Sequence, residues 1–102
     1  MKKKLSIIWD DEAKRSLKSI NEYIKSREST RVAAKVRSEI TRQIKTLNQF
    51  PEKFEEESIL KSEVGNFRYK VIWSYKIIYE VTPDVIYILD IFHTSRNPSN
   101  IL

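Results

Sequence analysis

The sequence contains no cysteine, one histidine, one glycine and three prolines among its 102 residues. Without cysteine there can be no disulfide framework and no thiolate metal site, and a single histidine cannot form an imidazole cluster. The scarcity of glycine and proline leaves little room for flexible linkers. These absences exclude disulfide-rich scaffolds and metal sites of thiolates or clustered imidazoles, and we expect no cofactor.

Long hydrophobic runs are absent as well. The basic residues 1–4 are followed by the apolar run 5–9, which stops at the acidic residues 10–12. This run is far too short for the hydrophobic part of a secretory signal, and no other stretch could cross a bilayer. We therefore expect a cytoplasmic protein with no membrane partner.

Charged residues are abundant. They make up 32% of the chain, with a net charge of +5 and an isoelectric point near 9.5, whereas about 25% is average for a globular protein. The length suits one domain with a modest core, and we expect residues 1–102 to form it. The positive charge favours a polyanionic partner, either nucleic acid or an acidic protein segment.

Two segments carry apolar residues at helical spacing. The first starts after Asp10 or Asp11 and the second at Ser29 or Thr30, which are residue types that cap helices. The stripes consist of Ala13, Leu17, Ile20 and Ile24, and of Ala33, Val36, Ile40, Ile44 and Leu47. A short polar turn between them predicts an antiparallel helical hairpin.

The flanks of this hairpin can also be interpreted. Basic residues off the two stripes are interrupted by Glu28 and Glu39, which favours a solvated face over a nucleic-acid face. Pro51 is expected to end the second helix, and Phe50 to pack back against the core.

After an acidic loop at 52–57, the apolar pattern changes to a period of two. It predicts strands at 67–73, 76–81 and 85–92, with turns at 73–75 and 82–84. The last strand is nearly all apolar, as in a strand buried on both faces. The fold expected is therefore α+β, with the order β-α-α-β-β-β and the helical hairpin packed on a small antiparallel sheet. The expected core includes Leu17, Ile20, Ile24, Val36, Ile40, Val71, Ile78, Ile88 and Leu89.

The lone histidine, His93, lies where the last apolar segment ends, three residues before Arg96. Histidine exchanges protons readily near neutral pH, so this position suits proton transfer or phosphate contact. Arg68 and Lys70 share one face of an earlier strand. If the two strands are neighbours, the four residues form one basic concavity. The alternative is that His93 is a surface or packing residue.

Several motifs follow one another in a specific order. They are a first strand ending in Trp9, the stripe Leu17-x-x-Ile20-x-x-Tyr23-Ile24, Leu47-x-x-Phe50-Pro51, Phe67-Arg68, Tyr75-Lys76-Ile77-Ile78-Tyr79-Glu80-Val81, and Ile91-x-His93-x-x-Arg96-Asn97-Pro98. Together they resemble the RelE/ParE superfamily of bacterial type II toxins over nearly the whole chain. The resemblance implies a small sheet backed by a helical hairpin, and a toxin neutralised by an antitoxin encoded beside it. We expect that antitoxin to be acidic.

The activity of such toxins differs between branches. RelE-like members cleave mRNA on the ribosome without a metal, whereas ParE-like members, among them plasmid-stabilisation toxins, poison DNA gyrase; the fold does not decide between them. RNA cleavage needs a base, an acid and cations that stabilise the phosphorane. In that case Arg68, Lys70, His93 and Arg96 would be the catalytic residues, and Glu57 could serve as a base unless its acidic patch is simply solvated.

Three features bear on this choice. Lys70 stands where arginine is usual in some members, and lysine lacks the bidentate fork of arginine. The preceding loop carries glutamates where some ribosome-dependent members have a dense basic cluster. The closing segment 93–98 is closer to ParE-like members, in which case residues 95–102 would belong to an interaction surface. The sequence therefore favours a gyrase poison, with the endoribonuclease as the alternative.

Further candidates remain beside these. Tyr75 and Tyr79 are candidate binding residues through base stacking, although packing within the sheet is the favoured alternative. Asn97, in the closing motif, is a third candidate binding residue. The chain could also be a non-toxic binding module on this fold, or a degenerate toxin that retains only antitoxin binding.

Overall fold

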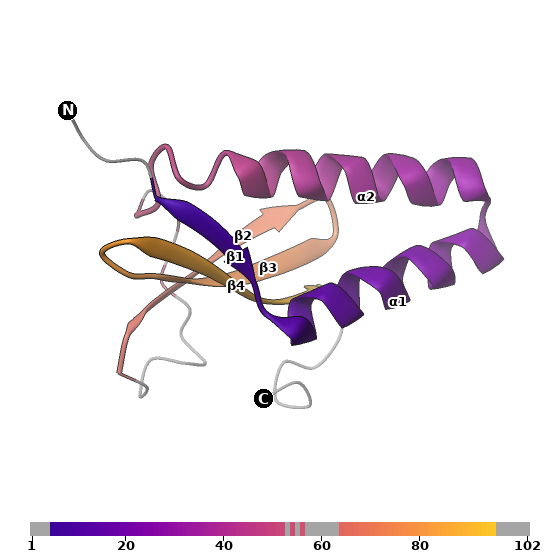
Figure 1. Ribbon diagram of the computed structural model, residues 1–102. Helices are drawn as coiled ribbons and strands as arrows, with labels where there is room; N and C mark the ends of the chain where they lie inside the picture. The colour runs from indigo at the N-terminus through magenta and orange to yellow at the C-terminus, as the bar shows by residue number, and fades with distance from the viewer. Residues whose placement is uncertain (1–4, 53, 55, 57–63, 96–102) are drawn as a thin grey trace.

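The computed structural model describes residues 5–52, 54, 56 and 64–95. Its elements are β1 (Ser6–Trp9), α1 (Asp11–Arg27), α2 (Thr30–Lys45), β2 (Asn66–Ile72), β3 (Tyr75–Val81) and β4 (Val85–His93). The two helices run antiparallel to each other and cover one face of the sheet (Figure 1). The predicted α+β class and the β-α-α-β-β-β order are confirmed.

The sheet is mixed, whereas the sequence predicted a purely antiparallel one. Its strand order is β1-β4-β3-β2. Strands β2, β3 and β4 form the expected antiparallel meander, but β1 pairs parallel to β4. The helical hairpin and strands β2 and β3 separate β1 from β4 in the chain, and so long a connection lets two strands pair in the same direction.

Both helices begin where the capping pattern predicted. Asp10 holds the extended N-cap position of α1, and the first turn of that helix is acidic while its last turn is basic, which complements the helix dipole. At α2 the Ser29 hydroxyl accepts a hydrogen bond of 3.1 Å from the Val32 N–H. No helix in the described part of the chain is long and apolar enough to cross a membrane.

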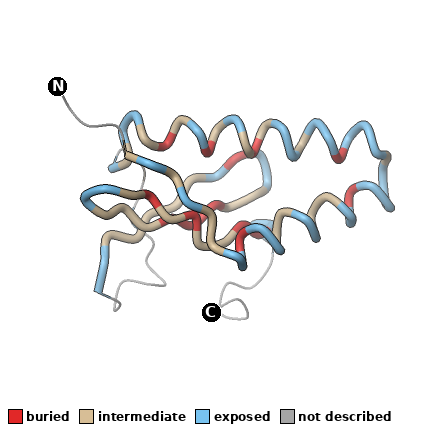
Figure 2. The backbone as a smooth tube through the Cα atoms, in the orientation of Figure 1, coloured by how far each residue is buried: buried red, intermediate tan, exposed pale blue. Residues whose placement is uncertain are grey.

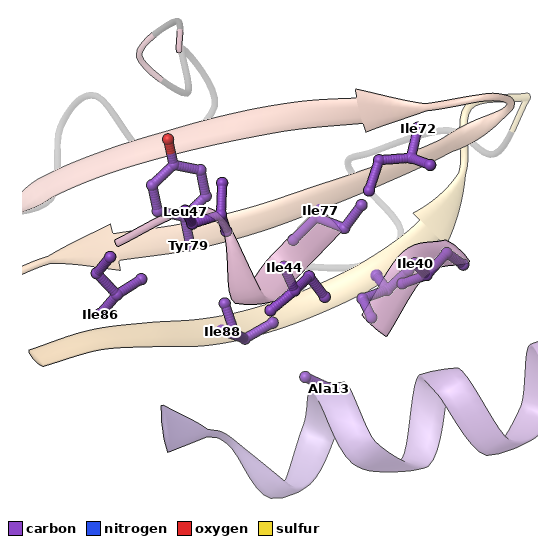
Figure 3. Packing of buried hydrophobic residues seen from close by; sticks show 10 residues of the cluster. Ala13, Ile40, Ile44, Leu47, Ile72, Ile77, Tyr79, Ile86 and Ile88 are labelled. Atoms are coloured by element: carbon purple, nitrogen blue, oxygen red, sulfur yellow. The ribbon is translucent and has the colours of Figure 1, made fainter. Parts of the chain in front are cut away.

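The core lies between the helical hairpin and the covered face of the sheet (Figures 2 and 3). Ile40 of α2, Tyr79 of β3 and Ile88 of β4 are all 0% exposed. Of the core residues predicted from sequence, Ile24, Ile40, Ile78 and Ile88 are buried, whereas Leu17, Ile20, Val36 and Leu89 are partly buried. The apolar stripes of both helices therefore face the sheet as expected.

Two residues predicted to be buried are exposed. Val71 is 48% exposed because it alternates with the buried Ile72 on the edge strand β2, and neighbouring strand residues point to opposite faces. Phe50 is 70% exposed. Helix α2 ends at Lys45, before Pro51, and the turns that follow do not continue the buried stripe beyond Leu47.

Strand β4 agrees with its prediction in part. Its fully buried residues Ile86 and Ile88 alternate with the half-buried Val85, Tyr87 and Leu89. Further along the strand the consecutive residues Ile91 and Phe92 are both buried, so burial on both faces, as predicted, holds at this end of β4 and only in part at the other.

Candidate functional site

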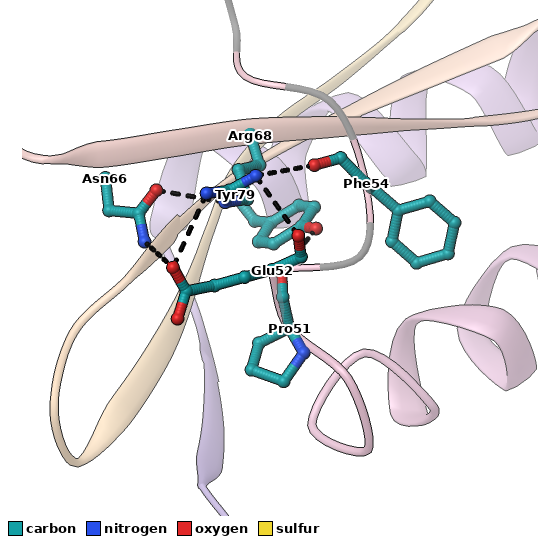
Figure 4. A network of polar contacts seen from close by, with 6 residues as sticks. All are labelled: Pro51, Glu52, Phe54, Asn66, Arg68 and Tyr79. Carbon is teal, nitrogen blue, oxygen red and sulfur yellow. Dashed lines mark hydrogen bonds and ion pairs between the residues drawn. The ribbon is translucent and has the colours of Figure 1, made fainter.

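Arg68 lies on the edge strand β2, and its guanidinium is bound by the chain that precedes this strand (Figure 4). Its Nη1 donates to the Phe54 carbonyl at 2.8 Å and to the Glu52 carbonyl at 3.2 Å. Its Nε donates to Asn66 Oδ1 at 3.0 Å, and its Nη2 lies 3.5 Å from the Glu52 carboxylate. With its side chain only 14% exposed, Arg68 holds the loop after α2 against the sheet.

Tyr79 takes part in the same attachment. It lies opposite Arg68 on β3 and donates from its hydroxyl to the Pro51 carbonyl at 2.9 Å. Burial raises the pKa of this phenol to about 12, and the nearby Arg68 charge opposes that rise. Since its ring belongs to the core, Tyr79 has no face left on which a base could stack.

Lys70 follows on the same face of β2. Its Nζ lies 4.7 Å from the centre of the Phe54 ring, in the geometry of a cation–π contact. Hydrogen bonds from Arg42 and Gln43, with a smaller contribution from the Lys70 charge, lower the pKa of the Glu39 carboxyl to about 2. The Lys70 charge therefore lies between α2 and the loop that Arg68 holds.

His93 ends β4 and is exposed. Its Nδ1 accepts a hydrogen bond of 3.1 Å from the Ser95 backbone N–H and lies 2.7 Å from the Ser95 hydroxyl. Because a backbone N–H can only donate, Nδ1 bears a lone pair in this arrangement, and the neutral ring carries its proton on Nε2. In this arrangement His93 presents its Nε2–H as a hydrogen-bond donor.

A groove of about 750 Å³ lies between α1 and the ends of β3 and β4. It is lined by Glu12, Arg15, Ser16, Ser19, Ile20 and Tyr23 from α1, and by Tyr75, Ile91, Phe92, His93 and Ser95 from the strands. Its apolar residues and hydroxyl groups suit a ligand that has an apolar body and a hydrogen-bonding edge.

Two of the rings that line this groove contact each other. The rings of Tyr75 and His93 meet edge to face, with their centres 5.4 Å apart. Burial raises the pKa of the Tyr75 phenol, and the nearby Tyr23 phenol contributes in the same direction. Tyr23 itself is 59% exposed, with the Arg27 guanidinium carbon 5.1 Å from its ring centre. Sequence reasoning did not select Tyr23 as a site residue, although it is an aromatic beside the buried stripe of α1.

The structure separates His93 from Arg68 and Lys70 among the predicted catalytic residues. Arg68 pairs with Tyr79, which pairs with Ile88, so β3 separates β2 from β4. His93 lies further along β4 and pairs with Tyr75, which places it about 13 Å along the strands and about 10 Å across them from Arg68. Arg68 and Lys70 share β2, and Tyr75 accompanies His93 in the groove. Arg96, Asn97 and the rest of 96–102 lie outside the described residues, as does Glu57.

Acidic residues and the histidine do not assemble a metal site in the part of the chain that the structure describes. There, no three or more His, Asp or Glu side chains come close enough together to hold an ion.

Comparison with known proteins identifies the family. The family model of the ParE toxin of the type II toxin-antitoxin system, parDE, matches residues 7–98. The chain belongs to the ParE toxin family. No curated protein sequence matches it. The ParE fold is also found in a solved structure, a chromosomal ParDE toxin–antitoxin system from P. aeruginosa, which has 21% sequence identity and a TM-score of 0.76.

That structural match covers 90% of this chain and 98% of the other. At such low identity it bears on the fold alone, and it agrees with the layout in Figure 1. The resemblance to the RelE/ParE superfamily that the motifs indicated is confirmed, and the chain is a toxin of the type II toxin–antitoxin class.

Proposed function

We propose that this ParE-family protein stops growth by poisoning DNA gyrase in the cytoplasm, and that a cognate antitoxin neutralises it. The observation that carries the choice is the separation of Arg68 from His93 by strand β3. Metal-free RNA cleavage needs cations and proton-transfer groups around one phosphate. Here the Arg68 guanidinium holds the loop after α2. His93 lies at the other end of the meander formed by β2, β3 and β4.

The state of His93 supports the same choice. Its Nδ1 accepts from Ser95, so the neutral ring offers only Nε2–H to a ligand. Deprotonation of a ribose 2′-hydroxyl would require this ring to change tautomer and release Ser95. The match to the ParE family over residues 7–98 agrees with a poison of gyrase, in which catalysis of RNA cleavage has no part.

The proposal can be tested by expressing the protein from a tightly controlled promoter and comparing two readouts. One is the accumulation of linear plasmid when purified protein is incubated with gyrase and supercoiled DNA, followed by detergent and protease. The other is the appearance of new mRNA 5′ ends after induction. We expect growth arrest and linear plasmid without new mRNA ends.

His93→Ala and Arg68→Lys serve as matched variants. Gyrase poisoning should survive His93→Ala, because it needs no proton transfer by the toxin, whereas RNA cleavage should be abolished by that change. New mRNA ends that depend on His93, in the absence of gyrase–DNA cleavage complexes, would establish the endoribonuclease alternative and overturn the proposal. Arg68→Lys preserves the charge while removing the bidentate fork, so it reports on the loop attachment.

The antitoxin is proposed to be acidic, with a segment that is disordered alone and folds on the basic toxin. The net charge of +5 favours such a partner, and segments of this kind lay apolar side chains into grooves while their acids pair at the rim. The groove beside α1 offers apolar surface for this purpose.

Co-expression with the neighbouring gene tests this pairing. The small acidic product should co-purify and restore growth, and added salt should weaken the complex without abolishing it, since apolar contacts are little screened. Failure of any neighbouring product to bind would remove the antitoxin from the proposal.

A further inference from the structure

Trp73 lies in the turn between β2 and β3, and both its backbone conformation and its solvent exposure are unusual for a tryptophan. Of the described residues other than glycine, Trp73 alone has a positive φ, +53°. This left-handed region suits glycine and asparagine and disfavours bulky side chains, and tight hairpin turns normally use those small residues there. A tryptophan at this position is therefore poor turn chemistry.

Burial of the indole does not offset the cost of this backbone conformation. Trp73 is 56% exposed, and Val71, two residues earlier on β2, is 48% exposed. Strained residues persist where the surroundings impose them, and they gather at functional sites. An exposed indole and an exposed valine at one hairpin end form an apolar projection, which we call the hairpin tip, defined as Val71 and Trp73.

A backbone hydrogen bond fixes the turn that carries the hairpin tip. The Thr94 N–H, just after β4, donates to the Ser74 carbonyl at 2.7 Å. The turn is thus fixed to the end of the neighbouring strand, beside the pair formed by Tyr75 and His93. A projecting aromatic on a fixed support loses little conformational freedom when it binds, which is the property of an interface anchor.

The charges around the tip have one sign. Residues 69–76 include no acidic residue, and Lys76 carries the positive charge on the face of Val71. Lys76 lies directly opposite Val71 in the sheet, with its Nζ 4.3 Å from the centre of the Tyr69 ring. A partner that accepts the tip is therefore best matched by an apolar pocket with carboxylates at its rim.

We propose that Trp73 is the anchor with which this toxin engages the folded protein that it acts on, by entering an apolar pocket with an acidic rim. The inference rests on the proposed function, in which the target is a protein. A projecting side chain needs a preformed concavity, and a folded protein has one. The antitoxin segment proposed above is disordered alone, so it would lie in grooves of the toxin instead.

Substitutions at Trp73 separate an anchor from a structural residue. Trp73→Asn and Trp73→Gly place residues that favour positive φ in the turn, so the urea midpoint of unfolding should stay the same or rise. Both variants should bind purified DNA gyrase about 30-fold more weakly, the loss typical of an interface hot spot. Induced growth arrest should be lost with them, whereas Trp73→Phe should retain part of both activities.

Phe50→Ala is the matched control, because Phe50 is a 70% exposed aromatic outside the tip. It should leave gyrase binding and growth arrest at wild-type levels. The anchor is refuted if Trp73→Asn arrests growth like the wild type, or if Phe50→Ala is equally impaired. A clear fall of the urea midpoint in both Trp73→Asn and Trp73→Gly would make Trp73 a packing residue and overturn the proposal.

The outcomes also separate this inference from the proposed function. If the wild type arrests growth without forming gyrase–DNA cleavage complexes, gyrase is not the target, and loss of arrest in Trp73→Asn still supports an anchor for another protein. If the wild type causes no arrest, both proposals fall. Equal weakening of antitoxin and gyrase binding would place the tip in the antitoxin interface and overturn the assignment to the target.

Discussion

Replacing Arg68 with alanine should destabilise the fold, because the residue attaches the loop after α2 to the edge strand β2. The change removes the donors that reach Phe54, Glu52 and Asn66, and it leaves two backbone carbonyls without these partners. Because only 14% of the Arg68 side chain is exposed, water can replace these contacts only in part. The loop and the hydrogen bond from Tyr79 to Pro51 should loosen together (Figure 4).

The magnitude follows from the contacts. A hydrogen bond from a charged donor contributes about 1.5–3 kcal/mol when it is well made, and the contact with the Phe54 carbonyl at 2.8 Å is the best of the set. The carbonyl of Glu52 shares the same nitrogen, and its carboxylate is 66% exposed at 3.5 Å, so that ion pair adds little. We expect a loss of about 2–4 kcal/mol in the free energy of unfolding, and a melting temperature roughly 10–20 °C lower.

Thermal and urea unfolding followed by circular dichroism would measure this loss. Arg68→Lys keeps the charge without the planar fork and should lose most of the same stability. Arg15→Ala is the control, because Arg15 pairs with Glu12 on the exposed side of α1 and its side chain is 68% exposed, so its midpoint should not change. A wild-type midpoint for Arg68→Ala, combined with loss of toxicity, would refute the structural role and return Arg68 to the functional site.

Three other changes test the core, the glycine and the buried phenol. Ile40→Ala should lower the free energy of unfolding by about 2–5 kcal/mol in urea titrations, since Ile40 is 0% exposed. Gly65→Ala should lower the melting temperature, because φ is +147° and an added Cβ would lie 2.7 Å from the Phe67 ring. Burial raises the pKa of Tyr79 to about 12. Its protonated hydroxyl therefore stabilises the fold below pH 10, and that contribution is lost as the pH rises from 10 to 12. The free energy of unfolding, measured against pH, should decline less over this range for Tyr79→Phe than for the wild type.

The helices were predictable because their signals are local. The spacing of Ala13, Ile24, Ile40 and Ile44 fixes which side of each helix meets the sheet, and all four are buried. The cap at Ser29 is likewise a short-range contact. The exposed Val71 was misjudged because apolar character alone does not tell which face of an edge strand is covered.

The site depended on information that the sequence does not carry locally. Arg68, Lys70 and His93 would have met only if β2 and β4 were neighbours, and the order β1-β4-β3-β2 is set by how the strands pair after the helical hairpin. The role of Arg68 depends on backbone carbonyls of the preceding loop, which no pattern of side chains reveals. The accepting state of His93 Nδ1 likewise depends on the turn to Ser95.

These assignments limit where a target can be recognised on the described surface. The covered face of the sheet is occupied by the helices, and its basic edge at Arg68 is occupied by the loop. Recognition must therefore use side chains that the fold leaves exposed. Val71 and Trp73 lie together at one hairpin end, whereas the exposed Phe50 lies on the loop after α2. At the hairpin tip, exposed apolar surface, a fixed turn and the Lys76 charge coincide, and for this reason we propose it as the surface that binds the target.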